Sequence, residues 1–146
     1  RLEQQPTYEN KINLSNEKNK FNKFLPAISW KLTEQEYKTL KINYELISDF
    51  FKKNNLGKIK PSKFILNLNK NLHSDVFAVG HHMGTTRMSS SSVNGVVDKN
   101  LKVHDLNNLY IAGSSVFPTG GYINPTMTIV ALSMRLNNHI YNLLKK

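Results

Sequence analysis

Residues 109–130 read LYIAGSSVFPTGGYINPTMTIV and contain, in order, an apolar run, a turn and the start of a helix. Residues 109–112 are apolar or aromatic and end at a Gly-Ser-Ser turn, which predicts a short buried strand. Farther on, Asn124 precedes Pro125, and this pair is typical of an N-cap followed by proline at the first helical position. The predicted helix continues to Lys145-Lys146. Because its first two turns are apolar almost all round, we expect burial on most of its sides.

The middle of the chain is predicted to be mostly irregular. Residues 59–71 show no clear period, so we expect a loop with a short element. Residues 81–88 read HHMGTTRM and lead into a serine-rich loop at 89–92. Leu101 and Val103 then alternate with polar neighbours, which predicts a second short strand.

An antiparallel hairpin is predicted near the start of the chain. Ile12 and Leu14 alternate with polar residues, as in a half-buried strand, and a second extended stretch follows at 27–32. The polar run at 16–20 is expected to be the turn between the two strands.

A long helix is expected after the hairpin. Thr33 and Glu36 have the spacing of a capping box, in which the threonine hydroxyl accepts from a helix amide and the carboxylate accepts from the cap amide. Apolar residues recur every three or four positions from 37 to 51, so one stripe should face a core. The helix is expected to end at three turn-forming residues, with glycine as the left-handed one: Asn54, Asn55 and Gly57.

Composition excludes several classes of protein. The chain has 146 residues, of which 39% are hydrophobic, enough for one domain or a piece of a larger protein. It contains no cysteine, which excludes a disulfide scaffold and any Cys-ligated zinc or iron–sulfur site. No apolar run approaches the roughly 20 residues of a membrane span. Because it begins Arg-Leu-Glu rather than with Met, we expect that residue 1 is not a natural start.

The chain is strongly basic, with 20 Lys and Arg against 10 Asp and Glu. Residues 1–70 hold 21 of these 30 charges, and residues 71–146 are charge-poor. Only 3 of the basic residues are Arg, and the 17 Lys are scattered among many Asn without clustering on an aromatic motif. We therefore interpret the charge as a solvated surface and predict no nucleic-acid site.

Two features contain side chains that could take part in catalysis. One of the adjacent residues His81 and His82 could take a proton from a substrate hydroxyl, and the Asn124 amide could hold the hydroxyl oxygen. Structural roles stay open for each, because a His-His pair is usually structural or solvent-exposed and Asn before Pro is usually only a cap. Adjacent residues point apart in a strand, so the two histidines predict no metal site. No Gly-x-Ser-x-Gly motif provides a nucleophile for acyl transfer.

Four motifs, in this order, resemble the C-terminal region of the glucose-methanol-choline (GMC) family of flavin oxidoreductases. They are His81-x-x-Gly84-Thr85-x-Arg87-Met88, Val97-Asp98-x-Asn100-Leu101-x-Val103, Asn108-Leu109-Tyr110-Ile111-Ala112-Gly113-Ser114 and Asn124-Pro125-Thr126-x-Thr128. The ordered set is far more specific than any one motif. The hairpin and capped helix resemble the substrate-domain part of bacterial members, so the resemblance covers nearly the whole chain.

The resemblance implies oxidation of a CH–OH group, in an alcohol or sugar-like substrate, to a carbonyl. In that family FAD takes the hydride at N5 and a histidine takes the hydroxyl proton; His81 matches this histidine. Asn124 matches a second active-site position that is His in some members and Asn in others. The resemblance also implies that the turn at Ala112-Gly113 lies along FAD and that the helix start at Asn124-Pro125-Thr126 faces the flavin pyrimidine.

The family binds FAD through an N-terminal Rossmann-type Gly-x-Gly-x-x-Gly unit, which this sequence does not contain. We therefore expect the chain to be the C-terminal portion of a longer enzyme, inactive alone, whose partner is the FAD-binding half. The predicted fold class is α+β. Residues 1–80 would give antiparallel strands and a capped helix to a substrate domain. Residues 81–146 would form the active-site and FAD-contacting segment, with a strand and a helix that pack on the FAD domain.

Two alternatives stay open at the level of sequence. One is a non-oxidising member of the same family, such as a lyase. The other is a basic module that binds nucleic acid or an anionic membrane surface.

Overall fold

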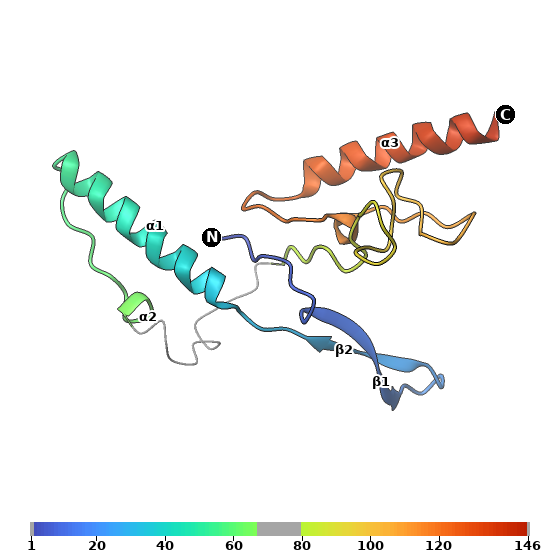
Figure 1. Ribbon diagram of the computed structural model, residues 1–146, viewed down its shortest axis with the longest axis horizontal. Helices are drawn as coiled ribbons and strands as arrows, with labels where there is room; N and C mark the ends of the chain where they lie inside the picture. Colours follow the sequence, from blue (N-terminus) through green and yellow to red (C-terminus); the bar gives the residue numbers. More distant parts are fainter. Residues whose placement is uncertain (1, 67–79, 146) are drawn as a thin grey trace. The chain divides into compact units, whose positions relative to one another are not determined.

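The computed structural model describes residues 2–66 and 80–145 (Figure 1). The elements in chain order are β1 (Lys11–Lys18), β2 (Phe24–Ser29), α1 (Glu34–Lys53), α2 (Lys63–Leu66), the 3-10 turn η2 (Ser114–Val116) and α3 (Thr126–Leu144). An antiparallel pair of strands combined with helices makes the fold α+β, as predicted. Of the helices in the described ranges, none combines the length and the apolar character that crossing a bilayer requires.

The described residues form two compact units. Residues 2–5 and 32–66 belong to one, and residues 6–31 and 80–145 belong to the other. The sequence predicts a division of the chain at residue 80 by role, with a substrate-domain part before it and an active-site and FAD-contacting part after it. This assignment of roles stays a prediction.

The hairpin of β1 and β2 is antiparallel, with Lys11 opposite Ser29 and Lys18 opposite Phe24. β1 extends to Lys18, so the turn lies at 19–23, later than the predicted run at 16–20. The expected half-burial is wrong, since the exposed fraction is 50% for Ile12 and 71% for Leu14. A two-stranded ribbon covers neither of its faces by itself, which explains this exposure.

The predicted capping box at the start of α1 is confirmed. The Thr33 hydroxyl accepts from the Gln35 amide at 3.3 Å, while the Thr33 amide and hydroxyl each donate to Glu36 Oε2 at 2.6 Å. The Gln5 amide adds a hydrogen bond of 2.9 Å to Glu36 Oε1. Burial raises the pKa of Glu36, but these hydrogen bonds from Thr33 and Gln5 outweigh it, and the pKa lies below its ordinary value.

The end of α1 differs from the prediction in one residue. Asn55, not Gly57, takes the left-handed conformation next to the last helical turn, with φ of 55°. The Leu56 amide donates to the Phe51 carbonyl at 2.9 Å and the Asn55 amide to the Lys52 carbonyl at 3.3 Å, which is a Schellman motif. Asparagine tolerates this conformation better than other side chains.

The apolar stripe of α1 is only partly covered in this chain. Tyr37, Leu40 and Tyr44 are half-buried, whereas Phe50 near the C-terminal end is 57% exposed. The short element expected within 59–71 is the single turn α2, and residues 67–71 of that range lie outside the described residues.

The core of the C-terminal segment lies between α3 and the loops that precede it. Its buried side chains are Val97, Leu101, Val116, Phe117 and Leu136. Ile129, Leu132 and Ile140 join Leu136 from α3 at steps of three and four, so one face of the helix packs on the loops. This packing positions residues 81–125, which form little regular structure of their own.

Three expectations about this segment are wrong. Residues 109–112 are not a buried strand: Tyr110 forms one isolated bridge with Lys102, and Leu109 is 46% exposed. The strand expected at 101–103 is likewise reduced to isolated bridges. Burial on most sides of the first two turns of α3 is also wrong, because Met127 is 79% exposed. The apolar side chains at positions 101, 103, 110 and 111 do pack in or against the core, but from loops rather than from a strand. Met127 lies outside this core.

Candidate functional site

The His81–Met88 segment lies alongside residues 114–116. The amides of Gly84, Thr86 and Met88 donate to the carbonyls of Ser114, Ser115 and Val116 at 3.2, 2.8 and 2.8 Å. Two side chains reinforce this pairing, since Ser114 Oγ donates to the His82 carbonyl at 2.9 Å and Thr86 Oγ1 donates to Ser115 Oγ at 2.8 Å. The first motif therefore meets the end of the third motif and the two residues that follow it, and five hydrogen bonds hold these segments together.

Gly84 allows the close approach of these two segments. Its φ is +81°, in the region that favours glycine. A Cβ at this position would also lie 3.3 Å from the Phe117 carbonyl oxygen. Backbone geometry thus explains the glycine of the Gly84-Thr85 pair.

The second motif forms a tight loop, and the residues just before and at its start are hydrogen-bonded to Arg87 and Ser89. Asp98 Oδ1 accepts from the amides of Asn100 and Lys102 at 2.8 and 3.0 Å. The Leu101 amide donates to the Asp98 carbonyl at 2.9 Å, and Leu101 has a φ of 66° while its side chain is fully buried. Arg135 of α3 fastens the loop, since its Nη2 donates to the Lys99 carbonyl at 2.6 Å.

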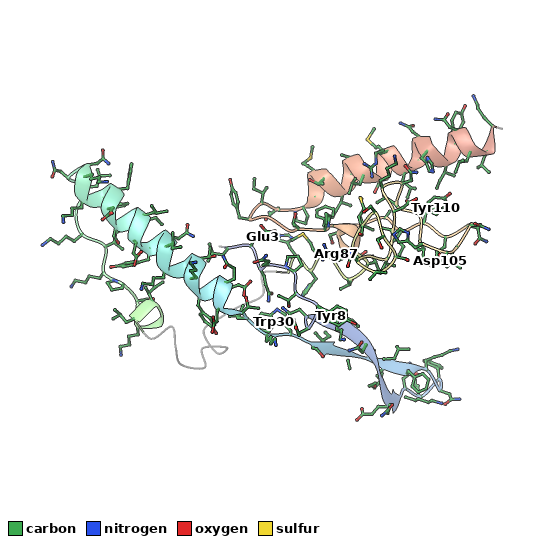
Figure 2. The ribbon with its side chains drawn as sticks, viewed as in Figure 1. Glu3, Tyr8, Trp30, Arg87, Asp105 and Tyr110 are labelled. Carbon is green, nitrogen blue, oxygen red and sulfur yellow. The ribbon has the colours of Figure 1, made fainter. Side chains whose placement is uncertain are left out.

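Two further residues of the motifs, Arg87 and Tyr110, are labelled in Figure 2. The Tyr110 ring packs edge-to-face on His139 of α3, with 6.1 Å between the ring centroids. Arg87 is half-buried, and its Nε atom has no hydrogen-bond partner among the described residues. Its carbonyl oxygen accepts from the Val96 amide at 2.8 Å.

A hollow of about 250 Å³ opens at the start of α3. It is lined by Phe117, Gly120, Gly121, Tyr122, Ile123, Asn124, Pro125 and Thr128. Pro125 is buried, whereas Asn124 is exposed. A Cβ at Gly121 would meet nothing within 4 Å, so the loop ahead of the helix leaves open space on this side.

The cap of α3 lies one residue later than predicted. Pro125, not Asn124, is the N-cap residue, and no side chain caps it. Pro125 has φ of −79° and ψ of −6°, and this ψ is less negative than that of a helix interior. Its carbonyl accepts the first helical hydrogen bond, from the Ile129 amide at 2.9 Å. Since the first turn of α3 contains no acidic residue, no carboxylate there offsets the positive end of the helix.

The structure places the candidate residues in two adjoining groups. Asn124 and Pro125 line the hollow, and Thr126 is the first residue of α3. Gly113 precedes η2 with φ of 120°, and a Cβ there would meet nothing within 4 Å; Ala112 is exposed. His81 is half-buried and is not among the described residues that line the hollow.

Met83 connects the two groups. A Cβ at Gly120 would lie 2.9 Å from Met83 Cε, so the side chain of Met83 contacts the loop that forms the hollow. The histidine segment therefore reaches the rim of the hollow two residues after His81.

Several residues of this site could not be identified from the sequence. Met83 was interpretable only as an apolar residue, and Phe117, Tyr122 and Ile123 carried no chemical signal. Thr128 belongs to the fourth motif and could have been named as a lining residue on that basis. Asp98 also had a local signal, because aspartate commonly accepts amide hydrogen bonds within turns.

The comparisons with known proteins identify the family of this chain. The family model described as GMC oxidoreductase matches residues 6–133, which include the hairpin, α1 and the four motifs. The chain therefore belongs to the GMC oxidoreductase family. FAD-containing flavoproteins are typical of this family, as the resemblance implied.

Individual relatives are similar over part of the chain. The 2-methyl-1,2-propanediol dehydrogenase of Mycolicibacterium austroafricanum is 40% identical over 60 residues, which cover 41% of this chain and 11% of that protein. The fructose dehydrogenase large subunit of Gluconobacter japonicus is 39% identical over 66 residues, covering 45% and 12%. The pyranose 2-oxidase of Lyophyllum shimeji is 38% identical over 65 residues, covering 44% and 10%. The matched region spans about a tenth of the length of these curated relatives.

The residues at the start of α3 fit a flavin. The uncapped helix start, free of acidic residues, suits a group that becomes partly negative. The open space at Gly113 and Gly121 would let a planar ring system approach the backbone.

Proposed function

We propose that this chain provides the substrate-facing part of an FAD-dependent oxidoreductase that converts a CH–OH group to a carbonyl. The proposed substrates are alcohols or sugar-like polyols, the classes named for the relatives above. One observation carries the proposal: the histidine motif is hydrogen-bonded to residues 114–116 and contacts the loop of the hollow through Met83. Family membership provides the chemical class of the reaction.

His81 is proposed to accept the proton of the substrate hydroxyl at an imidazole nitrogen. The bonds from Ser114 to the His82 carbonyl and from Gly84 to Ser114 restrain the backbone next to it, which favours a fixed position for the ring. Proton acceptance by a positioned base typically contributes 10²–10⁴-fold, roughly, to the rate.

Asn124 is proposed to hold the hydroxyl oxygen through its side-chain amide. It is exposed and lines the hollow beside the buried Pro125, so its side chain is accessible to a small molecule. An amide can donate to the oxygen without carrying a charge of its own.

The residues proposed to hold FAD are Ala112, Gly113, Asn124, Pro125 and Thr126. When bound, FAD would take the hydride from the substrate carbon. The start of α3 would stabilise negative charge in its vicinity, because the amides of the first turn have no side-chain cap at Pro125.

The partner proposed for this chain is an FAD-binding half of the same family. Exposed apolar side chains support this proposal. Met127 and Val130 on α3 are 79% and 48% exposed, and Leu109 is 46% exposed. We expect the isolated chain to bind FAD weakly or not at all.

The test compares two adjacent histidines in the chain joined to an FAD-binding half. His81→Ala should slow anaerobic flavin reduction by about two to four orders of magnitude with flavin still bound. His82→Ala is the matched control and should have a much smaller effect. Equal losses in both variants, or loss of flavin from both, would leave His81 with a structural role.

A further inference from the structure

The tip of the hairpin is a rigid turn organised by one asparagine. Asn19 Oδ1 accepts from the amides of Phe21 and Lys23 at 2.9 and 3.1 Å. The Asn19 amide donates to the Lys23 carbonyl at 2.8 Å, and the Asn22 amide donates to the Asn19 carbonyl at 2.9 Å. Asn22 takes the left-handed conformation with φ of 59°. Four hydrogen bonds within five residues fix how this tip presents its side chains.

This rigid tip exposes two aromatic side chains. Phe21 is 69% exposed and Phe24 is 50% exposed. A turn with such regular hydrogen bonding has no need of a large apolar residue at its apex, since Asn, Gly and Asp serve that position better. The exposed Phe21 ring therefore has no explanation in the stability of the turn.

Each ring is accompanied by a lysine. The Lys20 ammonium lies 5.1 Å from the centroid of the Phe21 ring, and the Lys18 ammonium lies 4.8 Å from that of Phe24. Lys23 is exposed in the same turn. Residues 11–31 contain five lysines and one glutamate, a net charge of +4.

We propose that the hairpin tip, defined as residues 18–24, binds the surface of an anionic phospholipid membrane. Aromatic rings settle at the headgroup level, and lysine stems extend along apolar surface while their ammonium groups reach the phosphates. Phe21 would enter the interface, and Lys18, Lys20 and Lys23 would contact anionic headgroups. The inference is independent of the proposed reaction and of His81.

The combination of rings and charge favours a membrane over a nucleic acid or an acidic protein. Lysines alone would serve any polyanion, and Arg, which makes bidentate contacts with phosphate and bases, is absent from residues 2–66. An aromatic residue at the apex, with lysines at positions 18, 20 and 23 around it, matches the amphipathic pattern of interfacial segments.

The experiment measures co-sedimentation of the full 146-residue chain with two kinds of vesicle. One kind is phosphatidylcholine alone, and the other contains phosphatidylcholine and phosphatidylserine in equal parts. We expect binding to the mixed vesicles that weakens as salt is raised, and little binding to the neutral ones. Removing two of the three charges of the tip with Lys20→Gln and Lys23→Gln should weaken binding roughly 25-fold, about fivefold for each lysine.

Matched controls remove the same charge or ring elsewhere. Lys38→Gln with Lys41→Gln removes two exposed lysines from α1, and Phe50→Ala removes a ring that is 57% exposed. Both should leave vesicle binding unchanged. Phe21→Ala should weaken it, and the thermal unfolding of every variant should match the parent chain.

A fluorescence measurement tests insertion separately from adhesion. In a Trp30→Phe background, Phe21→Trp should show emission shifted to shorter wavelength on mixed vesicles. This variant keeps an aromatic apex and so remains informative if Phe21→Ala does not fold. The proposal is overturned if the mixed vesicles are not bound, if the α1 controls weaken binding as much as the tip variants, or if the emission does not shift. Binding to duplex DNA that needs the tip lysines but not Phe21 would also overturn it.

Discussion

The hydroxyl groups of Thr86 and Ser115, 29 residues apart in sequence, share a hydrogen bond of 2.8 Å from Thr86 Oγ1 to Ser115 Oγ. The amide of Thr86 also donates to the carbonyl of Ser115 at 2.8 Å. One residue pair thus joins the histidine motif to the turn after the Ala-Gly pair through both backbone and side chain. This pair provides two of the five hydrogen bonds that hold the two segments together.

Thr86→Val should destabilise the chain by about 1 kcal/mol. The substitution keeps the shape of the side chain but removes the donor, leaving the half-buried Ser115 Oγ without this hydrogen bond. Urea-induced unfolding gives the free energy difference. Ser92→Ala, in the exposed serine loop, is the control and should stay within about 0.5 kcal/mol. A change in Thr86→Val no larger than that of Ser92→Ala would mean that the junction contributes little.

Gly95→Ala should be more damaging than its position in an exposed loop suggests. An added Cβ would lie 2.5 Å from Ser89 Cβ and 2.7 Å from the Arg87 carbonyl oxygen, which already accepts from Val96 at 2.8 Å. Because that oxygen is held by its own hydrogen bond, the loop must shift, at a cost of about 1–3 kcal/mol.

The control for Gly95→Ala is Val93→Ala, at a side chain that is 85% exposed in the same loop. Its unfolding free energy should change by less than about 0.5 kcal/mol. Adding Ser89→Gly to Gly95→Ala should restore part of the loss, because one of the two short contacts disappears. No recovery in the double variant would place the strain elsewhere in the loop.

Interactions between near neighbours explain which elements the sequence could predict. The capping box at Thr33 and Glu36 spans three residues, so its donors and acceptors can be identified without knowing the tertiary fold. The hairpin followed from alternation, although its turn moved because β1 continues through Glu17 and Lys18. Asn55 replaced Gly57 as the left-handed residue, since both are compatible with a helix end.

Long-range packing explains what the sequence could not predict. The left-handed conformation of Leu101 is rare for a branched apolar residue and is maintained by full burial together with its bond to Asp98. The role of Met83 depends on Gly120, 37 residues away, which no periodicity connects to it. His81 and Asn124 were named through motif order, and their catalytic roles remain proposals.

Glu36→Gln should destabilise α1 at neutral pH by about 1–3 kcal/mol. The carboxylate accepts three hydrogen bonds, from the Gln5 amide, the Thr33 amide and the Thr33 hydroxyl, whereas a neutral amide presents only one acceptor oxygen. Helix content by circular dichroism during urea unfolding measures the loss. Glu34→Gln, at an exposed residue of the same turn, should change the stability much less.

The difference between parent and Glu36→Gln should depend on pH. Since hydrogen bonds from Thr33 and Gln5 lower the pKa of Glu36 despite its burial, the folded state favours the charged carboxylate. Its stabilisation is therefore fully present above the unfolded value of about 4.3 and is lost as pH falls through the lower folded pKa. A stability difference that stayed constant from neutral pH to pH 3, roughly, would show that the charge of Glu36 is not its cause.

Asn124→Asp separates a structural role from a catalytic one, because the two roles lead to opposite results. Asn124 lies just before the Pro125 cap, at the positive end of α3, where a carboxylate is favourable, so the aspartate variant should unfold at the same or a higher temperature. The proposed amide donor is lost, however, and a carboxylate would oppose negative charge forming on a bound flavin. In the chain joined to an FAD-binding half, we expect normal folding with much slower anaerobic flavin reduction by an alcohol or sugar.

Asn124→His keeps a donor and should retain more activity than Asn124→Asp. Flavin reduction at the parent rate in Asn124→Asp would restrict Asn124 to shaping the start of the helix, and equal losses in the two variants would show that size rather than hydrogen bonding matters at this position.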